Sequence, residues 1–221
     1  MGGSIMQITI REPGSAITHY IGMMMALIAA VPLVIKASLS QNMLCIIAMV
    51  IFIGSMVLLY GASATYHAVN LTGKALKAFK KIDHMMIFVL IAGSYTPVCL
   101  LVLEPDVGLP LLGLVWGTAV IGMLIKLFWV TCPKWFSSII YIAMGWECVL
   151  VFGPLVETLE TGAFWWLLIG GLFYTVGGVI YALKIPFLNH LHKYFGLHEI
   201  FHLFIMAGSV CHFVFMFNYV I

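Results

Sequence analysis

Charged residues are scarce in this chain. They make up 8% of its 221 residues, whereas hydrophobic residues make up 63%, and a typical soluble domain carries about 25% charged residues. A water-soluble fold of this length cannot hide so much apolar surface, so the composition excludes a soluble globular protein. The net charge of +2 also gives no basis for a nucleic-acid partner. We therefore expect an integral membrane protein.

Paired cysteines and internal repeats are also absent. The five cysteines form no CxxC motif and fall mostly inside apolar stretches, which excludes a disulfide framework and indicates small core residues. No repeat, low-complexity tract or flexible linker divides the chain. We expect a single domain over residues 1–221, and the sequence leaves the oligomeric state open.

Long apolar stretches are what the sequence has instead. A helix that crosses a bilayer needs about 20 mostly apolar residues. Seven stretches meet this requirement: 17–36, 43–68, 83–103, 109–130, 136–156, 162–182 and 197–219. The short alternating segments of a membrane β-barrel are not seen. The sequence predicts an all-α membrane protein, a bundle of seven transmembrane helices in which neighbours along the chain run antiparallel.

The placement of lysines predicts the orientation of this bundle, because positive residues gather on the cytoplasmic side. Most basic residues lie before the first span, in the connections after the second and sixth spans, or on either side of the connection after the fourth: Arg11, Lys74, Lys77, Lys80, Lys81, Lys126, Lys134, Lys184 and Lys193. The opposite side carries Lys36 and four acidic residues: Glu104, Asp106, Glu157 and Glu160. We expect a cytoplasmic N-terminus and a C-terminus outside.

Three short polar groups interrupt the apolar stretches, each at one end of a span. They are the segment from Ser63 to His67, the pair Asp83-His84, and the segment from His198 to His202. The predicted topology places the end of the second span and the starts of the third and seventh on the cytoplasmic side. We therefore expect the three groups to meet at one membrane depth.

The residue types in these groups indicate a metal site. His198 and His202 lie four residues apart, so on a helix they differ by ~40° in direction and ~6 Å in height and can reach one ion. His67 can supply a third nitrogen, and three protein ligands with one open position are typical of catalytic zinc. Asp83 could then orient the bound water or take its proton, and Ser63 could donate a hydrogen bond to a ligand or to an oxyanion. Histidines in membrane helices also serve as hydrogen-bonded packing residues, and that alternative stays open.

The segment HEIFH also matches HExxH, the zinc metalloprotease motif in which the glutamate is the general base. Glu199 would point ~100° away from His198 on a helix. His212 follows His202 by ten residues, ~15 Å along the helix, which is too far to ligate the same ion. His212 could line a polar cavity or form a hydrogen bond across helices. A membrane protease stays a further alternative.

The order S-x3-H, a later Asp and H-x3-H on a seventh span resembles the progestin and adipoQ receptor family. The stretches SATYHAV, KKIDHMMIFVLIAGSYTP and GSVCHF are most similar to its bacterial branch, the hemolysin III proteins. The resemblance covers nearly the whole chain and implies a multi-pass protein of the bacterial inner (plasma) membrane.

The resemblance also implies residue roles. Zn²⁺ would be held by His67, His198 and His202, with Asp83 at the zinc-bound water and Ser63 beside the site. Glu12, Ser15 and His19 take the places of the family's acidic residue, Asn and His before the first span, so Ser15 departs from the family pattern.

Two hypotheses for function follow. The wider superfamily includes alkaline ceramidases, so the first is a zinc-dependent hydrolase of a lipid amide or ester, with a membrane lipid as substrate, Asp83 as general base and Ser63 at the oxyanion. The second is a non-enzymatic sensor or a pore-forming hemolysin, in which zinc is structural and holds the second and seventh spans together.

Overall fold

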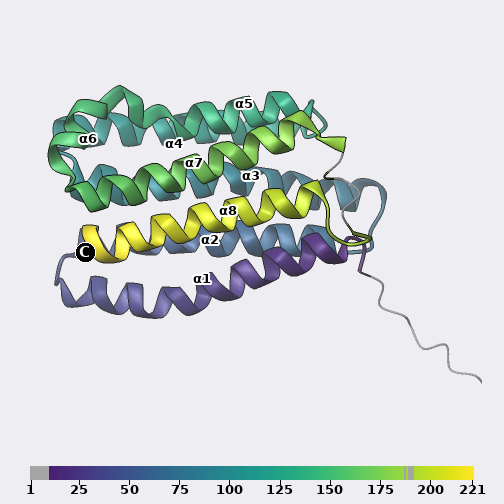
Figure 1. Cartoon of the computed structure of the whole chain (residues 1–221), viewed down its shortest axis with the longest axis horizontal. Helices are drawn as coiled ribbons and strands as arrows, with labels where there is room; N and C mark the ends of the chain where they lie inside the picture. Colours follow the sequence, from purple (N-terminus) through teal and green to yellow (C-terminus); the bar gives the residue numbers. More distant parts are fainter. Residues whose placement is uncertain (1–9, 187, 189–191) are drawn as a thin grey trace, which may run out of the picture.

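The computed structural model describes residues 10–186, 188 and 192–221. Within these residues the chain forms seven helical spans that are long and apolar enough to cross a membrane. They lie side by side in one bundle, and the first helix begins at the end opposite to the C-terminus (Figure 1). The prediction of an all-α bundle with seven spans is confirmed.

The spans are built from eight α-helices and three short irregular helical turns. In chain order they are α1 (Pro13–Leu39), α2 (Met43–Ala68), α3 (Gly73–Pro97), η1 (Val98–Val102), α4 (Pro105–Trp129), α5 (Lys134–Gly145), η2 (Glu147–Val151), α6 (Phe152–Thr158), α7 (Thr161–Leu183), α8 (Leu197–Phe215) and η4 (Met216–Val220). The turns η1 and η4 extend α3 and α8, and η2 joins α5 to α6 within one span.

Local sequence signals explain several helix starts. Pro13 and Pro105 occupy the first turns of α1 and α4, where a missing N–H costs nothing. Asn42 precedes α2, and its side-chain oxygen accepts hydrogen bonds from the backbone N–H of Leu44 (2.9 Å) and Cys45 (3.4 Å). The start of α2 therefore coincides with the predicted boundary.

The third span differs from the prediction. Helix α3 begins at Gly73 and not near Asp83, so Lys74, Lys77 and Lys80, predicted to lie in a connection, stand on its first turns. The prediction was wrong because it followed hydropathy alone, whereas lysine is a good helix former and nothing after Gly73 breaks the helix. Asp83 consequently lies ten residues, ~15 Å, inside the helix.

The fifth span also differs, because it is not one continuous helix. The side chain of Tyr95 enters the helical ladder: its hydroxyl donates to the carbonyl of Gly145 (2.7 Å) and accepts from the backbone N–H of Cys148 (3.0 Å). In a continuous α-helix the Gly145 carbonyl would accept from Val149 and the Cys148 N–H would donate to Met144. The inserted hydroxyl takes both groups instead and so explains the break between α5 and α6.

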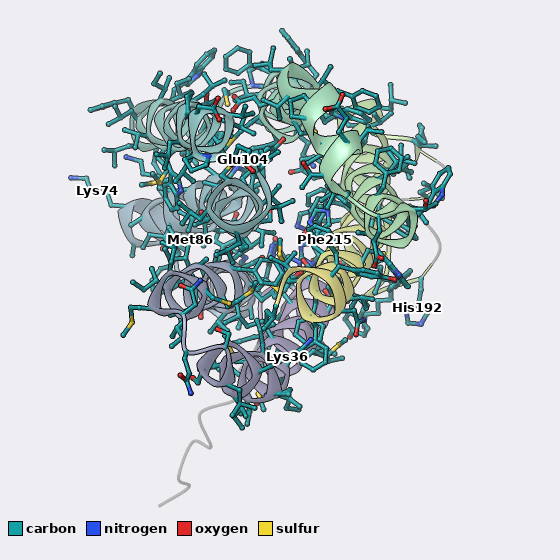
Figure 2. The ribbon with its side chains drawn as sticks, turned by 90° about the vertical axis from the view of Figure 1, so that its left-hand side faces the viewer. Lys36, Lys74, Met86, Glu104, His192 and Phe215 are labelled. Carbon is teal, nitrogen blue, oxygen red and sulfur yellow. The ribbon has the colours of Figure 1, made fainter. Side chains whose placement is uncertain are left out.

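Seen from one end, the helices form a ring around a central space (Figure 2). Helix α1 packs against α2 and α8, and α7 packs between α5 and α8. Large apolar side chains such as Ile28, Leu39 and Phe128 face outward, more than two thirds exposed. In water such a surface would favour aggregation, whereas hydrocarbon accommodates it. The basic residues at the beginnings of α1, α3, α5 and α8 share one end of the bundle, called here the lysine-rich end.

Candidate metal centre

Three imidazoles from two helices meet near the lysine-rich end. His67 lies on the last turn of α2, and His198 and His202 lie on the first two turns of α8. One ring nitrogen from each histidine lies within 4.8 Å of the corresponding nitrogens of the other two. His67 and His202 are buried, and His198 is partly buried. The structure thus brings together the three histidines that the sequence singled out.

In His67 and His202, the ring nitrogen that faces away from this cluster is hydrogen-bonded to an oxygen atom of α1 or of its N-terminal flank. The Thr18 hydroxyl donates its single hydrogen to the carbonyl of Ser15 (3.0 Å) and lies 2.9 Å from Nδ1 of His202. It must therefore accept from His202, which places the proton of that ring on Nδ1. The carboxylate of Glu12 likewise accepts from Nδ1 of His67. Both histidines are left with an unprotonated Nε2 for the centre.

The spacing of the free nitrogens suits a tetrahedral metal ion. Nε2 of His67 and Nε2 of His198 are 3.2 Å apart. Two imidazole nitrogens bound at 2.0–2.1 Å with tetrahedral angles are separated by ~3.3 Å. Three imidazoles at this spacing, two of them with fixed tautomers, form a donor set that can hold a metal ion.

The spacing of residues in the sequence did not predict that Glu12 and Thr18 belong to the site. The resemblance pointed to Glu12, Ser15 and His19, and nothing in the sequence singled out Thr18. The hydrogen bond from His67, together with the neighbouring guanidinium of Arg11, lowers the pKa of Glu12 to about 2, although partial burial opposes the shift. Glu12 is therefore an anion at neutral pH.

His19 stacks on the imidazole of His202, with ring centroids 3.4 Å apart and planes 10° from parallel. Its two nitrogens are buried and find no hydrogen-bond partner among the residues that the structure describes. His19 therefore covers one face of a ligand and restricts its rotation.

Asp83 and Ser63 lie beside the three imidazoles. Asp83 is buried at 8% exposure, and it interacts with the hydroxyl of Ser63 and lies within electrostatic range of His67. The carboxylate reaches this position from the third turn of α3, because the helix begins ten residues before it.

Glu199 points elsewhere. One of its carboxylate oxygens accepts from the Ser15 hydroxyl and the other from the backbone N–H of Gly196, at 2.8 Å. The carboxylate caps the first turn of α8 and joins that helix to α1. Of the HExxH pattern, the two histidines belong to the centre and the glutamate stabilises the helix start.

Comparison with known proteins matches the chain over nearly its whole length. A family model described as "Haemolysin-III related" matches residues 7–213. The chain belongs to this family. Similar proteins include Hemolysin-3 of Bacillus cereus, 36% identical over 216 residues, which cover 97% of this chain and 94% of that protein. The Hemolysin-3 homolog of Bacillus subtilis (strain 168) is 37% identical over 207 residues, covering 93% and 92% of the two chains.

The family and the seven apolar helices together identify a multi-pass bacterial membrane protein of the haemolysin-III type. The predicted resemblance to the bacterial branch is confirmed.

In this family member two of the three imidazoles, those of His198 and His202, border a large cavity. The cavity measures about 510 Å³ and lies among α3, α5, α7 and α8. His198, His202, Asp83 and Ser63 form part of its wall, and His212 lines it deeper in the bundle. Most of the remaining wall is apolar. An apolar chain can therefore lie in the cavity with a polar group at the candidate metal centre.

Proposed function

We propose that this membrane protein is a zinc-dependent hydrolase of a lipid amide or ester. The observation that carries the proposal is the meeting of three imidazole nitrogens with a buried carboxylate, Asp83, at the wall of a largely apolar cavity. A hydrolytic centre for lipids needs a metal-ligand set, a proton acceptor and room for an acyl chain, and these lie side by side here.

His67, His198 and His202 would hold the ion. Imidazole nitrogens suit zinc, and three protein ligands leave a position open for chemistry. Zinc, when bound, would supply a Lewis acid that polarises a carbonyl group and acidifies water. Glu12 and Thr18 keep the Nε2 lone pairs of two ligands directed to the centre.

Asp83 would act as the general base. The Ser63 hydroxyl donates to its carboxylate, which lies within electrostatic range of His67. The same hydroxyl, if turned toward a substrate carbonyl, would stabilise negative charge that develops on the oxygen. Burial of both side chains keeps bulk water from competing for these hydrogen bonds.

The test is an assay of purified protein for zinc content and for hydrolysis of a panel of fatty amides and esters. Asp83→Asn should keep the zinc and lower kcat by about 100-fold or more, because the base is lost and the ligands are untouched. Asp106→Asn, at the opposite end of the bundle, is the matched control and should keep full activity. A folded, zinc-loaded protein that hydrolyses none of the panel would contradict the proposal.

A second candidate is a pore-forming or sensing protein with structural zinc. It is favoured by the position of the imidazoles on two different helices, α2 and α8, which one ion would link, and by the name Hemolysin-3 of two relatives. Dye release from lipid vesicles tests the pore. Here Asp83→Asn should leave both the metal content and the dye release unchanged, whereas in a hydrolase the same variant keeps its metal and loses turnover.

A further inference from the structure

Lysines from four elements surround one end of the cavity. Lys80 of α3, Lys134 of α5 and Lys184 after α7 line it directly. Lys126 of α4 is 1% exposed, and its ammonium donates to the side chains of Ser137 and Cys132, which themselves line the wall. The lysines are separated in sequence by up to a hundred residues, so it is the fold that gathers them.

These positive charges are only partly balanced. Lys134 lies within electrostatic range of both Lys184 and Lys80, so like charges face one another across the cavity end. Asp83 is the one carboxylate among the described residues that line the cavity. It interacts with Ser63 and His67 as well as with Lys80.

Glu12 also lies within range of Lys134. Its carboxylate is already engaged by His67 and by Arg11, at 3.2 Å from the latter. The end of the cavity therefore keeps an excess of positive charge that a bound anion would neutralise.

The cavity wall changes in a fixed order along α3. Lys80 comes first, Asp83 follows within one turn, and Ile87, Leu90 and Val98 continue the wall. At 1.5 Å per residue, Val98 lies ~22 Å beyond Asp83 along the axis. A molecule lying along this wall meets cationic, then reactive, then apolar surface. Its acyl carbonyl would be at Asp83 when its head group is among the lysines.

We propose that the ligand of this cavity is an acyl amphiphile with an anionic head group, a phosphate or a carboxylate. The head group binds between Lys134 and Lys184, and the acyl chain occupies the apolar part. As a statement about the substrate, this inference rests on the proposed hydrolase function and names the class of substrate. Water adds across the acyl C–N or C–O bond, the leaving nitrogen or oxygen takes a proton, and the products are a fatty acid and an anionic amine or alcohol.

Binding can be tested without turnover. Hexadecyl phosphate has no acyl carbonyl and so cannot undergo the proposed reaction. Its dissociation constant is measured on the purified full chain in neutral detergent and compared with that of the neutral amide N-hexadecanoylethanolamine. Trp146 lines the cavity and supplies a fluorescence signal.

The variant is Lys134→Gln with Lys184→Gln. The matched control is Lys74→Gln with Lys77→Gln, which removes two exposed lysines from the same end of the molecule. Neither control lysine is part of the described cavity wall, and Lys74 projects away from the bundle (Figure 2).

We expect the cavity variant to bind hexadecyl phosphate about tenfold more weakly and the neutral amide equally well, because two charge contacts are lost. The control variant should bind both as the unaltered protein does. Equal weakening in both variants would show attraction to surface charge alone and overturn the proposal. So would equal affinity of the unaltered protein for the two probes.

Turnover separates this inference from the proposed function. N-hexadecanoylglutamate and N-hexadecanoylethanolamine carry the same acyl amide with an anionic or a neutral leaving group. Faster hydrolysis of the glutamate amide than of the ethanolamine amide, with a raised KM for the glutamate amide in the cavity variant, supports both the hydrolase function and the anionic substrate. Equal hydrolysis of the two amides rejects the anionic substrate and keeps the hydrolase. Specific binding of hexadecyl phosphate without hydrolysis of either amide rejects the hydrolase and keeps the anion site.

Discussion

Hydrogen bonds from α1 and its flank decide which nitrogen two of the three histidines offer to the candidate metal centre. Thr18 and Glu12 do not reach the centre themselves, but they fix the tautomers of His202 and His67. A neutral imidazole ligates through its unprotonated nitrogen only, so a wrong tautomer would turn an N–H toward the ion. The candidate metal centre therefore depends on Thr18 and Glu12 as well as on its three histidines.

Loss of a ligand should abolish metal binding. His198→Ala leaves two imidazoles, too few for a stable zinc site, so zinc per protein should fall from near one to near zero by elemental analysis. His192→Ala, which removes an exposed histidine of the α7–α8 connection, is the control and should keep the metal. An unchanged zinc content in His198→Ala would show that the metal, if present, lies elsewhere.

Loss of a supporting hydroxyl should weaken the centre without destroying it. Thr18→Val keeps the shape of the side chain but removes the acceptor for Nδ1 of His202, so zinc affinity should fall about 10–100-fold. Competition with a chelator measures the change. Thr158→Val removes an exposed hydroxyl that bonds only within its own helix turn, to Pro154 at 2.8 Å, and should leave the affinity unaltered. Equal affinities in the two variants would remove Thr18 from the site.

Sequence spacing predicted the ligands but not their supports, for a physical reason. The pattern H-x3-H places two imidazoles on one helix face whatever the rest of the fold does. Thr18 reaches His202 only because α1 packs against α8, 184 positions later in the chain. No local pattern encodes that contact. The roles of Asp83 and Ser63 in catalysis stay predictions.

At the scale of helices, close packing is set by small residues. A Cβ added at Gly122 of α4 would lie 2.2 Å from the ring of Phe88, which is fully buried in α3. A Cβ at Gly117 of the same helix would meet no atom within 4 Å. Helix pairs in membranes approach closely where such residues face each other.

Gly122→Ala should therefore destabilise the bundle. The methyl group forces α3 and α4 apart or displaces the Phe88 ring, at a cost of about 1–3 kcal/mol, which should appear as a lower Tm in detergent. Gly117→Ala receives the same gain in helix propensity, about 1 kcal/mol, without the clash. Equal Tm values for the two variants would show that α3 and α4 move apart at this contact at little cost in stability.

Helix boundaries were predictable where a polar residue marks them and not where side chains from other helices intervene. Asn42 caps α2 and fixes its start. The break between α5 and α6 depends on Tyr95 of α3, fifty residues earlier, and hydropathy contains no sign of it. Hydropathy also started the third span too late in the chain, at Asp83 instead of Gly73, because it treats helical lysines as a loop.

At the scale of the whole molecule, seven spans place the two ends of the chain on opposite sides of the membrane. The lysine distribution predicts that the lysine-rich end is cytoplasmic. Alkaline phosphatase fused after Ile221 should then be active in intact bacteria, because its disulfides form only outside the cytoplasm. The same enzyme inserted after Thr72 should be inactive. The reverse pattern would invert the bundle and place the candidate metal centre outside.

The contact between α1 and α8 has a consequence for biogenesis. Ser15 with Glu199 and Thr18 with His202 join residues that are 184 positions apart. A ribosome delivers α1 to the membrane long before it has made α8. Until then His67 stands alone, and the hydroxyl of Thr18 has no imidazole to hold. The candidate metal centre is thus complete only after α8 has been inserted, so a chain that stops before Leu197 should bind no metal through these histidines.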